Sequence, residues 1–197
     1  MQPAREPGME ADWSVEIGAG LPVIDADWPG FVDLRRDIRS IDSIPEGAAE
    51  PVLREALVTL NGAASPVFTS KCDVWALGAD EIDPDEFGCA PRDACAAGWA
   101  SWIDLLVREP RRFASFEAHD AWVRRTTAHL RTDMIPCGRV DLVVRAAVAH
   151  ASEGFGITLY SAGCGVDTQA ARAAWERVLR AAVTATMREA RASSSIG

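Results

Sequence analysis

Three segments that the sequence predicts to be β-strands each carry one aspartate near the middle, next to cationic or aromatic side chains. Alternation along a strand would place these groups on one face of a sheet. Clustered carboxylates beside arginine and tryptophan can hold a polar or cationic small molecule, or tune one another for acid–base chemistry. The candidate ligand-binding residues are Asp73, Trp75, Trp102, Asp104, Arg139, Asp141, Arg145 and Tyr160.

The same pattern is also typical of cross-strand ion pairs on a sheet face that is covered by solvent or by another subunit. The two alternatives predict different shapes for this face of the sheet. Convergence in one concave pocket would favour a binding or catalytic site, whereas a flat, ion-paired surface would not.

The cysteines offer a second possible chemistry. Cys89 and Cys95 lie in an acidic loop, and Cys72 lies on the preceding predicted strand. Their spacing lacks the tight pair of a zinc knuckle, and no histidine is near them in sequence. Five cysteines are an odd set in a chain large enough to fold without covalent links, so reduced thiols are expected. We therefore predict no metal, no cofactor and no disulfide.

Nucleophilic catalysis has little support in the sequence. His119 and His129 are predicted to lie on the surface of an arginine-rich helix. Cys164 lies between two glycines that are predicted to form a turn before the last helix, where a thiol would meet a positive helix end. Phosphate-loop, GxGxxG and GxSxG motifs are all absent from the sequence.

The composition excludes several classes of partner. The chain has 197 residues, 48% of them hydrophobic, and a net charge of −9. This acidic balance repels nucleic acid and anionic lipid surfaces. No apolar run resembles a signal peptide or a membrane span, so the expected location is cytoplasmic.

The clearest structural signal is a pair of strands within residues 139–165. Val140, Leu142 and Val144 alternate with charged residues, and Phe155–Tyr160 alternates in the same way after a connection at Glu153–Gly154. A period of two with one apolar face indicates an antiparallel hairpin.

Other patterns complete the predicted fold. Helical spacing predicts helices over residues 51–61 and 110–131, with Trp122 facing outward, and a last helix capped by Asp167 or Thr168. Strands are predicted over 67–77 and 99–107. The order from residue 67 is a ββα-ββα near-repeat. This predicts an α+β two-layer sandwich, with an antiparallel sheet, two long helices on one face and an extra N-terminal helix. A ferredoxin-like arrangement is the alternative.

The predicted organisation is a single domain over residues 13–190, with a disordered lead-in at 1–12 and a disordered tail at 191–197. We expect a noncatalytic small-molecule-binding or self-associating protein, as a homodimer, without nucleic-acid or membrane partners. The alternative is a small enzyme that acts on a polar or cationic molecule through the carboxylates of the open sheet face.

Overall fold

The computed structural model describes residues 8–18, 20–25, 31–90 and 93–192 of the chain. Most of the predicted lead-in and tail therefore lies outside the described residues. The first strand begins at Glu10, within the predicted lead-in, and the last helix ends at Ala192, within the predicted tail.

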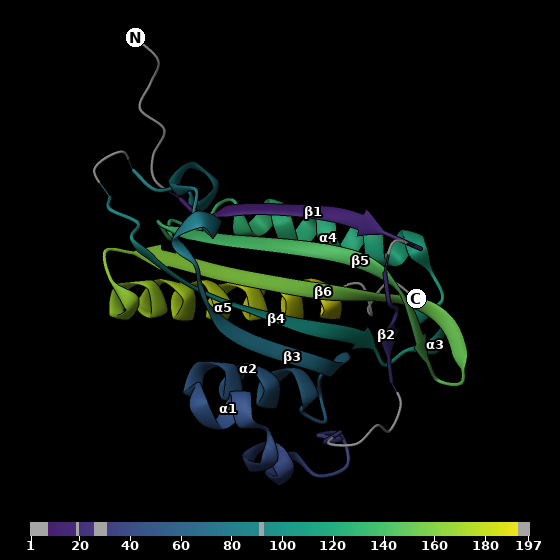
Figure 1. The fold of residues 1–197 in the computed structure, drawn as a ribbon. Coiled ribbons are helices and arrows are strands. Elements are labelled where there is room, and N and C mark those ends of the chain that lie inside the picture. The colour runs from purple at the N-terminus through teal and green to yellow at the C-terminus, as the bar shows by residue number, and fades with distance from the viewer. Residues whose placement is uncertain (1–7, 19, 26–30, 91–92, 193–197) are drawn as a thin grey trace.

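The protein is a mixed α/β fold built on one sheet (Figure 1). Among the described residues six strands form it: β1 Glu10–Glu16, β2 Val23–Ile24, β3 Val67–Leu77, β4 Ala97–Val107, β5 Gly138–Ala149 and β6 Ser152–Gly165. Their order is β1-β5-β6-β4-β3, and β2 pairs with β5 beyond the end of β1. Both β1 and β2 run parallel to β5, so the prediction of a wholly antiparallel sheet is wrong at this edge. Alternation indicates a strand but carries no information about its direction.

Three helices, α2 Pro51–Asn61, α4 Phe116–Leu130 and α5 Thr168–Ala192, pack on one face of the sheet (Figure 1). Their apolar sides share one core with inward residues of β4, β5 and β6, including Ile103, Leu142 and Leu159. The short helix α1 Pro45–Ala49 precedes α2. Burial of these apolar faces is the main stabilising contribution, at roughly 25 cal/mol per Å² of apolar surface.

The single helix predicted over residues 110–131 is two helices, α3 Pro110–Phe113 and α4. Ser115 has extended backbone angles and its hydroxyl accepts a hydrogen bond from Ala118 N, so it acts as the N-cap of α4. A capping serine inside a continuous apolar stripe separates the two helices, which periodicity alone does not detect.

Two residues of α4 were predicted to be on the surface and are buried. Trp122 is 1% exposed, and its indole nitrogen donates to Thr186 O at 3.2 Å. His119 is fully buried beside Trp122 and Phe155. Trp122 is buried because α5 packs along α4, whereas His119 is buried against Trp122 and the Phe155 ring of β6.

The β5–β6 hairpin is present, but its turn differs from the predicted one. His150 and Ala151 form the connection with φ angles of 53° and 57°. Positive φ at both central residues is the conformation of a type I′ turn, which matches the twist of the strands it joins. The predicted turn at residues 153–154 lies inside β6.

The predicted turn at residues 163–165 is also part of β6. A Cβ atom added to Gly163 would lie 2.2 Å from Trp175 N, on the backbone of α5. Glycine is therefore required here by the close approach of helix and strand rather than by a turn.

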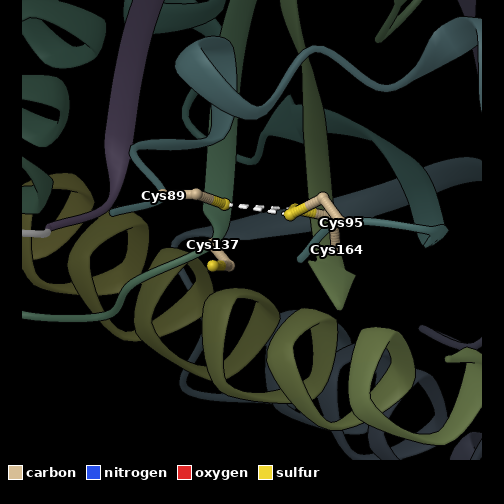
Figure 2. Close-up of side chains that lie close together, drawn as sticks. All are labelled: Cys89, Cys95, Cys137 and Cys164. Carbon is tan, nitrogen blue, oxygen red and sulfur yellow. Dashed lines mark hydrogen bonds between the residues drawn. A yellow bond between two sulfur atoms is a disulfide. The ribbon is translucent and has the colours of Figure 1, made fainter. Parts of the chain in front are cut away.

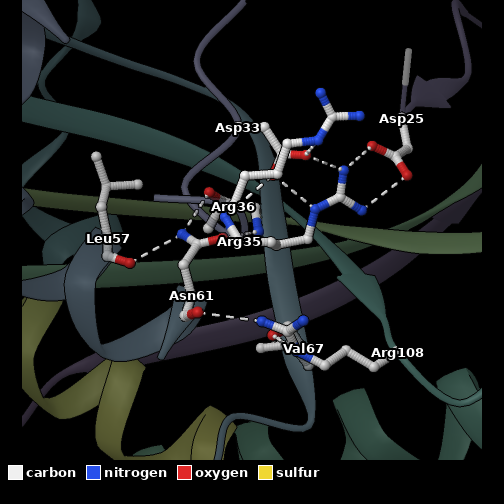
Figure 3. Close-up of polar contacts among 9 residues, drawn as sticks. Asp25, Asp33, Arg35, Arg36, Leu57, Asn61, Val67 and Arg108 are labelled. Carbon is white, nitrogen blue, oxygen red and sulfur yellow. Dashed lines mark hydrogen bonds and ion pairs between the residues drawn. The ribbon is translucent and has the colours of Figure 1, made fainter. Parts of the chain in front are cut away.

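The face of the sheet opposite the three helices is covered only in part. At the hairpin end, Arg35 donates to Asp25 and Asp33 (Figure 3). Its guanidinium lies 4.3 Å from the centre of the Phe68 ring. The guanidinium of Arg108 lies 5.8 Å from the centre of the same ring. These contacts cover the hairpin end of this face. A cleft lies over the rest of it.

Candidate binding cleft and cysteine cluster

The strand register aligns the sequence-predicted site residues on one face. Asp141 lies opposite Tyr160, Tyr160 lies opposite Trp102, and Trp102 lies opposite Asp73, so one row crosses four strands. Residues paired in this way point to the same side of an antiparallel sheet. Trp75 and Arg139 belong to the next row, which passes through alanines of β4 and β6.

Five of the eight candidates line one cleft of about 420 Å³: Trp75, Arg139, Asp141, Arg145 and Tyr160. The walls also include Glu16 from the end of β1, Glu81 from the loop after β3, and Glu86 and Phe87 from the 3-10 helix η3 Pro84–Phe87. The cleft therefore lies over the middle of the sheet between two acidic walls.

The two arginines of the cleft are each held by carboxylates. Arg139 donates to Asp141 at 2.6 and 3.2 Å and also contacts Glu86. The hydrogen bond with Asp141 is the main reason that the pKa of Arg139 is raised. Arg145 forms an ion pair with Glu16 at 2.9 Å and donates to the Tyr160 hydroxyl at 3.3 Å. These contacts fix the orientation of both guanidinium groups.

A smaller cleft of about 190 Å³ adjoins the first and shares Glu86, Arg139 and Asp141 with it. It adds one cation, Arg131, which is paired with Asp12, and further carboxylates. Across both clefts the acidic lining residues are Glu10, Asp12, Glu16, Glu81, Asp85, Glu86 and Asp141, against Arg131, Arg139 and Arg145. The surface they form is acidic.

The remaining candidates lie apart from the cleft. Trp102 lines a separate hollow of about 280 Å³ with Lys71 and Cys72. Asp73 is exposed on the outer strand β3. Asp104 is buried, accepts a hydrogen bond of 2.6 Å from the Thr158 hydroxyl, and has a pKa raised chiefly by burial. The structure thus gathers five of the eight residues in one cleft, and the other three do not line it.

The structure also forms a cluster that the sequence analysis missed: Cys89, Cys95, Cys137 and Cys164 (Figure 2). All four sulfur atoms lie within 4.8 Å of one another. Cys95 and Cys164 are joined as a disulfide, contrary to the prediction of five thiols, and Cys89 and Cys137 are free. Cys72, which we had grouped with Cys89 and Cys95, lies elsewhere on β3.

One sequence signal could have identified half of this cluster. In the hairpin register Gly138 pairs with Gly163, so Cys137 and Cys164 must lie next to each other just beyond this pair. The apolar alternation of β5 and β6 fixes that register. The positions of Cys89 and Cys95 could not be found in this way, because they depend on the path of a long loop.

Comparison of the chain with protein-family models, with curated proteins and with solved structures finds no match. Within the described ranges, none of the helices has the length and apolar character needed to cross a bilayer.

Proposed function

We propose that this protein is a noncatalytic binding protein whose sheet-face cleft holds a small cationic molecule with an apolar portion. The observation that carries the proposal is the convergence of Trp75, Arg139, Asp141, Arg145 and Tyr160 in one concave cleft of about 420 Å³. This volume lies within the range of small-molecule sites, which combine apolar walls with a few polar groups that orient the ligand.

The charges favour a cation over an anion. Arg139 and Arg145 are already paired with carboxylates of the same cleft, so neither offers an open anion site. The surrounding carboxylates outnumber the arginines, and the whole chain carries a net charge of −9. Such a field raises the local concentration of cations. Trp75 and Tyr160 supply aromatic surface for the apolar part of the ligand or for a cation–π contact.

The enzyme alternative has weaker support. It needs Asp73, Asp104 and Asp141 close together, yet only Asp141 lines the cleft. Paired carboxylates act as general acid and base when both reach the same substrate. The separation of these three aspartates favours binding without catalysis.

The proposal is tested by calorimetric titration with spermidine, a small linear polyamine, and with citrate as an anionic comparison. We expect one spermidine molecule to bind per chain, with an affinity that decreases at high salt. Citrate is not expected to bind. Glu81→Gln keeps the oxygen that accepts from Gly78 N at 2.7 Å but removes the charge. It is expected to weaken binding by about two- to five-fold, as for a partly exposed ion pair.

The matched control is Glu153→Gln, which removes an exposed carboxylate at the hairpin end of β6. It should leave the affinity unchanged. Equal binding of citrate, no spermidine binding, or equal effects of the Glu81 and Glu153 substitutions would refute the proposal.

Self-association into a homodimer is the second candidate function. β1 is an edge of the sheet in the described part of the chain. Three apolar residues at this edge are exposed, Val15 at 39%, Ile17 at 50% and Leu21 at 86%. An edge strand with apolar neighbours is a template for pairing with a second copy of the chain.

The arrangement of the strands and helices into repeated units is also proposed. We interpret the fold as a two-layer sandwich of two ββα units, and the chain order β3, β4, α4, β5, β6, α5 supports this interpretation.

A further inference from the structure

Four of the five cysteines of this chain meet at one end of the sheet, although they come from separate parts of the sequence (Figure 2). Cys89 follows η3, Cys95 precedes β4, Cys137 precedes β5, and Cys164 is near the end of β6. We propose that, in the reduced protein, these four cysteines bind one zinc ion as a structural site.

The spacing of the sulfur atoms fits a tetrahedral site. Zinc–sulfur bonds of about 2.3 Å separate the ligand sulfurs by roughly 3.8 Å. Cys89 Sγ lies 3.1 Å from Cys95 Sγ and 3.3 Å from Cys164 Sγ, and every sulfur in the cluster is within 4.8 Å of the others. Small side-chain rotations would open this set to accept the ion.

The backbone holds these cysteines in place. Cys164 N donates to Cys137 O at 3.0 Å, which joins the two strand ends. Cys89 N donates to Pro84 O at 3.2 Å, after Gly88 ends η3 with a left-handed φ of 60°. Ala96 N donates to Gly165 O at 2.8 Å and fixes the segment that carries Cys95. Backbone hydrogen bonds of the strand ends and of the adjoining loop therefore help to hold the four positions.

A disulfide alone does not explain the whole cluster. The Cys95–Cys164 bond uses two sulfurs and leaves the thiols of Cys89 and Cys137 beside it. Cys89 Sγ contacts only other sulfurs in the described structure, and Cys137 Sγ donates a long 3.8 Å bond to Asp93, whereas one cation would engage all four thiolates together. Three of the cysteines are half-buried, so an ion can reach the cluster from solvent.

The chemistry requires the reduced state. A thiol reductant supplies two electrons and two protons to cleave the Cys95–Cys164 bond and is itself oxidised to a disulfide. Four thiols then release four protons as they bind zinc, which leaves a net charge of −2 on the complex.

Four protein ligands leave zinc no open position, so the site would be structural rather than catalytic. Zinc binding would stabilise the loop between β3 and β4, residues 78–96. Two short 3-10 helices are the regular elements described in this loop, and Phe87 is its main buried apolar residue. Zinc would tie both Cys89 and Cys95 of this loop to the sheet.

The test is the zinc content of protein purified with dithiothreitol and without chelator or added metal, measured by inductively coupled plasma and native mass spectrometry. We expect about one zinc per chain. Cys89→Ser and Cys137→Ser should lose most of it, because each removes one of four ligands. Cys72→Ser is the matched control and should retain it, since Cys72 lies outside the cluster.

The substitutions of Cys89 and Cys137 also distinguish zinc binding from a cluster that only forms a disulfide. Both variants keep Cys95 and Cys164, so the disulfide can still form. Zinc contents equal to wild type in both variants would overturn the proposal, as would iron in place of zinc. So would a metal-free reduced protein that binds neither added Zn²⁺ nor Co²⁺. A Co²⁺ complex with thiolate charge-transfer and tetrahedral absorption bands would support it. Release of zinc from the wild-type protein by an organomercurial supports it independently of whether the variants fold.

Discussion

Cys89 Sγ lies 3.3 Å from Cys164 Sγ, although 75 residues separate the two cysteines along the chain. Glu86, three residues before Cys89, contacts Arg139 in the cleft. The cysteine cluster and the candidate cleft therefore both include residues of one loop segment, residues 78–90. An ion held at one end of this loop would stabilise the acidic wall at the other end.

Loss of zinc should increase the local mobility of this wall. In Cys89→Ser we expect amides of residues 78–90 to exchange hydrogen several-fold faster than in wild type, while β5 and β6 exchange at unchanged rates. Hydrogen exchange with mass spectrometry under reducing conditions measures both regions. Cys72→Ser should behave as wild type. Unchanged exchange in a zinc-free Cys89→Ser protein would show that the loop is held by its other contacts.

Gly163→Ala should destabilise the protein by about 1–3 kcal/mol, the usual cost of overpacking. Its Cβ would lie 2.2 Å from Trp175 N and 2.7 Å from Ala174 C, so α5 would have to move away from β6. Gly62→Ala is the control, because the nearest atom to its added Cβ is Val58 O at 3.5 Å. Urea unfolding compares the two, and equal stabilities would contradict the close helix–strand contact.

Local patterns predicted many of the elements because each depends on neighbours in the sequence. Helix α2 begins at Pro51 and ends at Asn61, as predicted. Proline at the first position marks its start, and the end of the apolar stripe marks its last turn. The paired strands β5 and β6 were predicted from their alternation. The same alternation predicted that Asp141 and Tyr160 share one face of the sheet, and the strand register places them opposite each other.

Features set by tertiary contacts could not be predicted in this way. The burial of Trp122 depends on α5, which lies 64 residues further along the chain at the contact with Thr186. The parallel pairing of β1 with β5 depends on how a distant segment returns to the sheet edge. The cysteine cluster depends on both a hairpin register and a loop path, and only the register can be read from the sequence.

Asp104→Asn should make the protein more stable than wild type at pH 7. Burial raises the pKa of Asp104, against the opposing effects of Thr158, Arg145 and Lys71. Between the unfolded and folded pKa values the native state binds more protons, so wild-type stability falls as pH rises through this window. Asparagine carries no charge and still accepts from Thr158.

The difference between Asp104→Asn and wild type should therefore shrink as pH falls from the raised pKa of Asp104 toward the ordinary pKa of an aspartate, and stay small below it. Thermal unfolding from pH 3 to pH 8 measures it, and Asp73→Asn, at an exposed position on β3, is the control. A variant less stable than wild type at pH 7 would show that attraction to Arg145 and Lys71 outweighs the cost of burial.

Ile17→Glu should disrupt the proposed homodimer. Ile17 is 50% exposed directly after β1, and a charge there would repel the second copy, which carries the same substitution. Sedimentation velocity at several concentrations should show a dimer for wild type and a monomer for the variant. Met134→Glu is the control, because Met134 is 62% exposed in the connection between α4 and β5. A monomeric wild-type protein would exclude self-association through this edge.

His119 should make the protein less stable in mild acid. Burial lowers the pKa of His119 to about 4, while the backbone of Ser115 and the charge of Arg112 act more weakly. The neutral ring donates from Nδ1 to Ser115 O at 2.9 Å, and Nε2 is buried with no partner among the described residues. The unfolded state therefore binds more protons between pH 6.5 and about 4.

Stability should consequently fall as pH decreases through that window, by on the order of 3 kcal/mol in total. His119→Gln keeps a donor for Ser115 O but cannot be protonated, so it should lose most of this dependence. His129→Gln, on the same helix, should retain it. Urea unfolding at pH 4.5 and pH 7 measures each variant, and a wild-type pH dependence that persists in His119→Gln would assign the acid sensitivity to other groups.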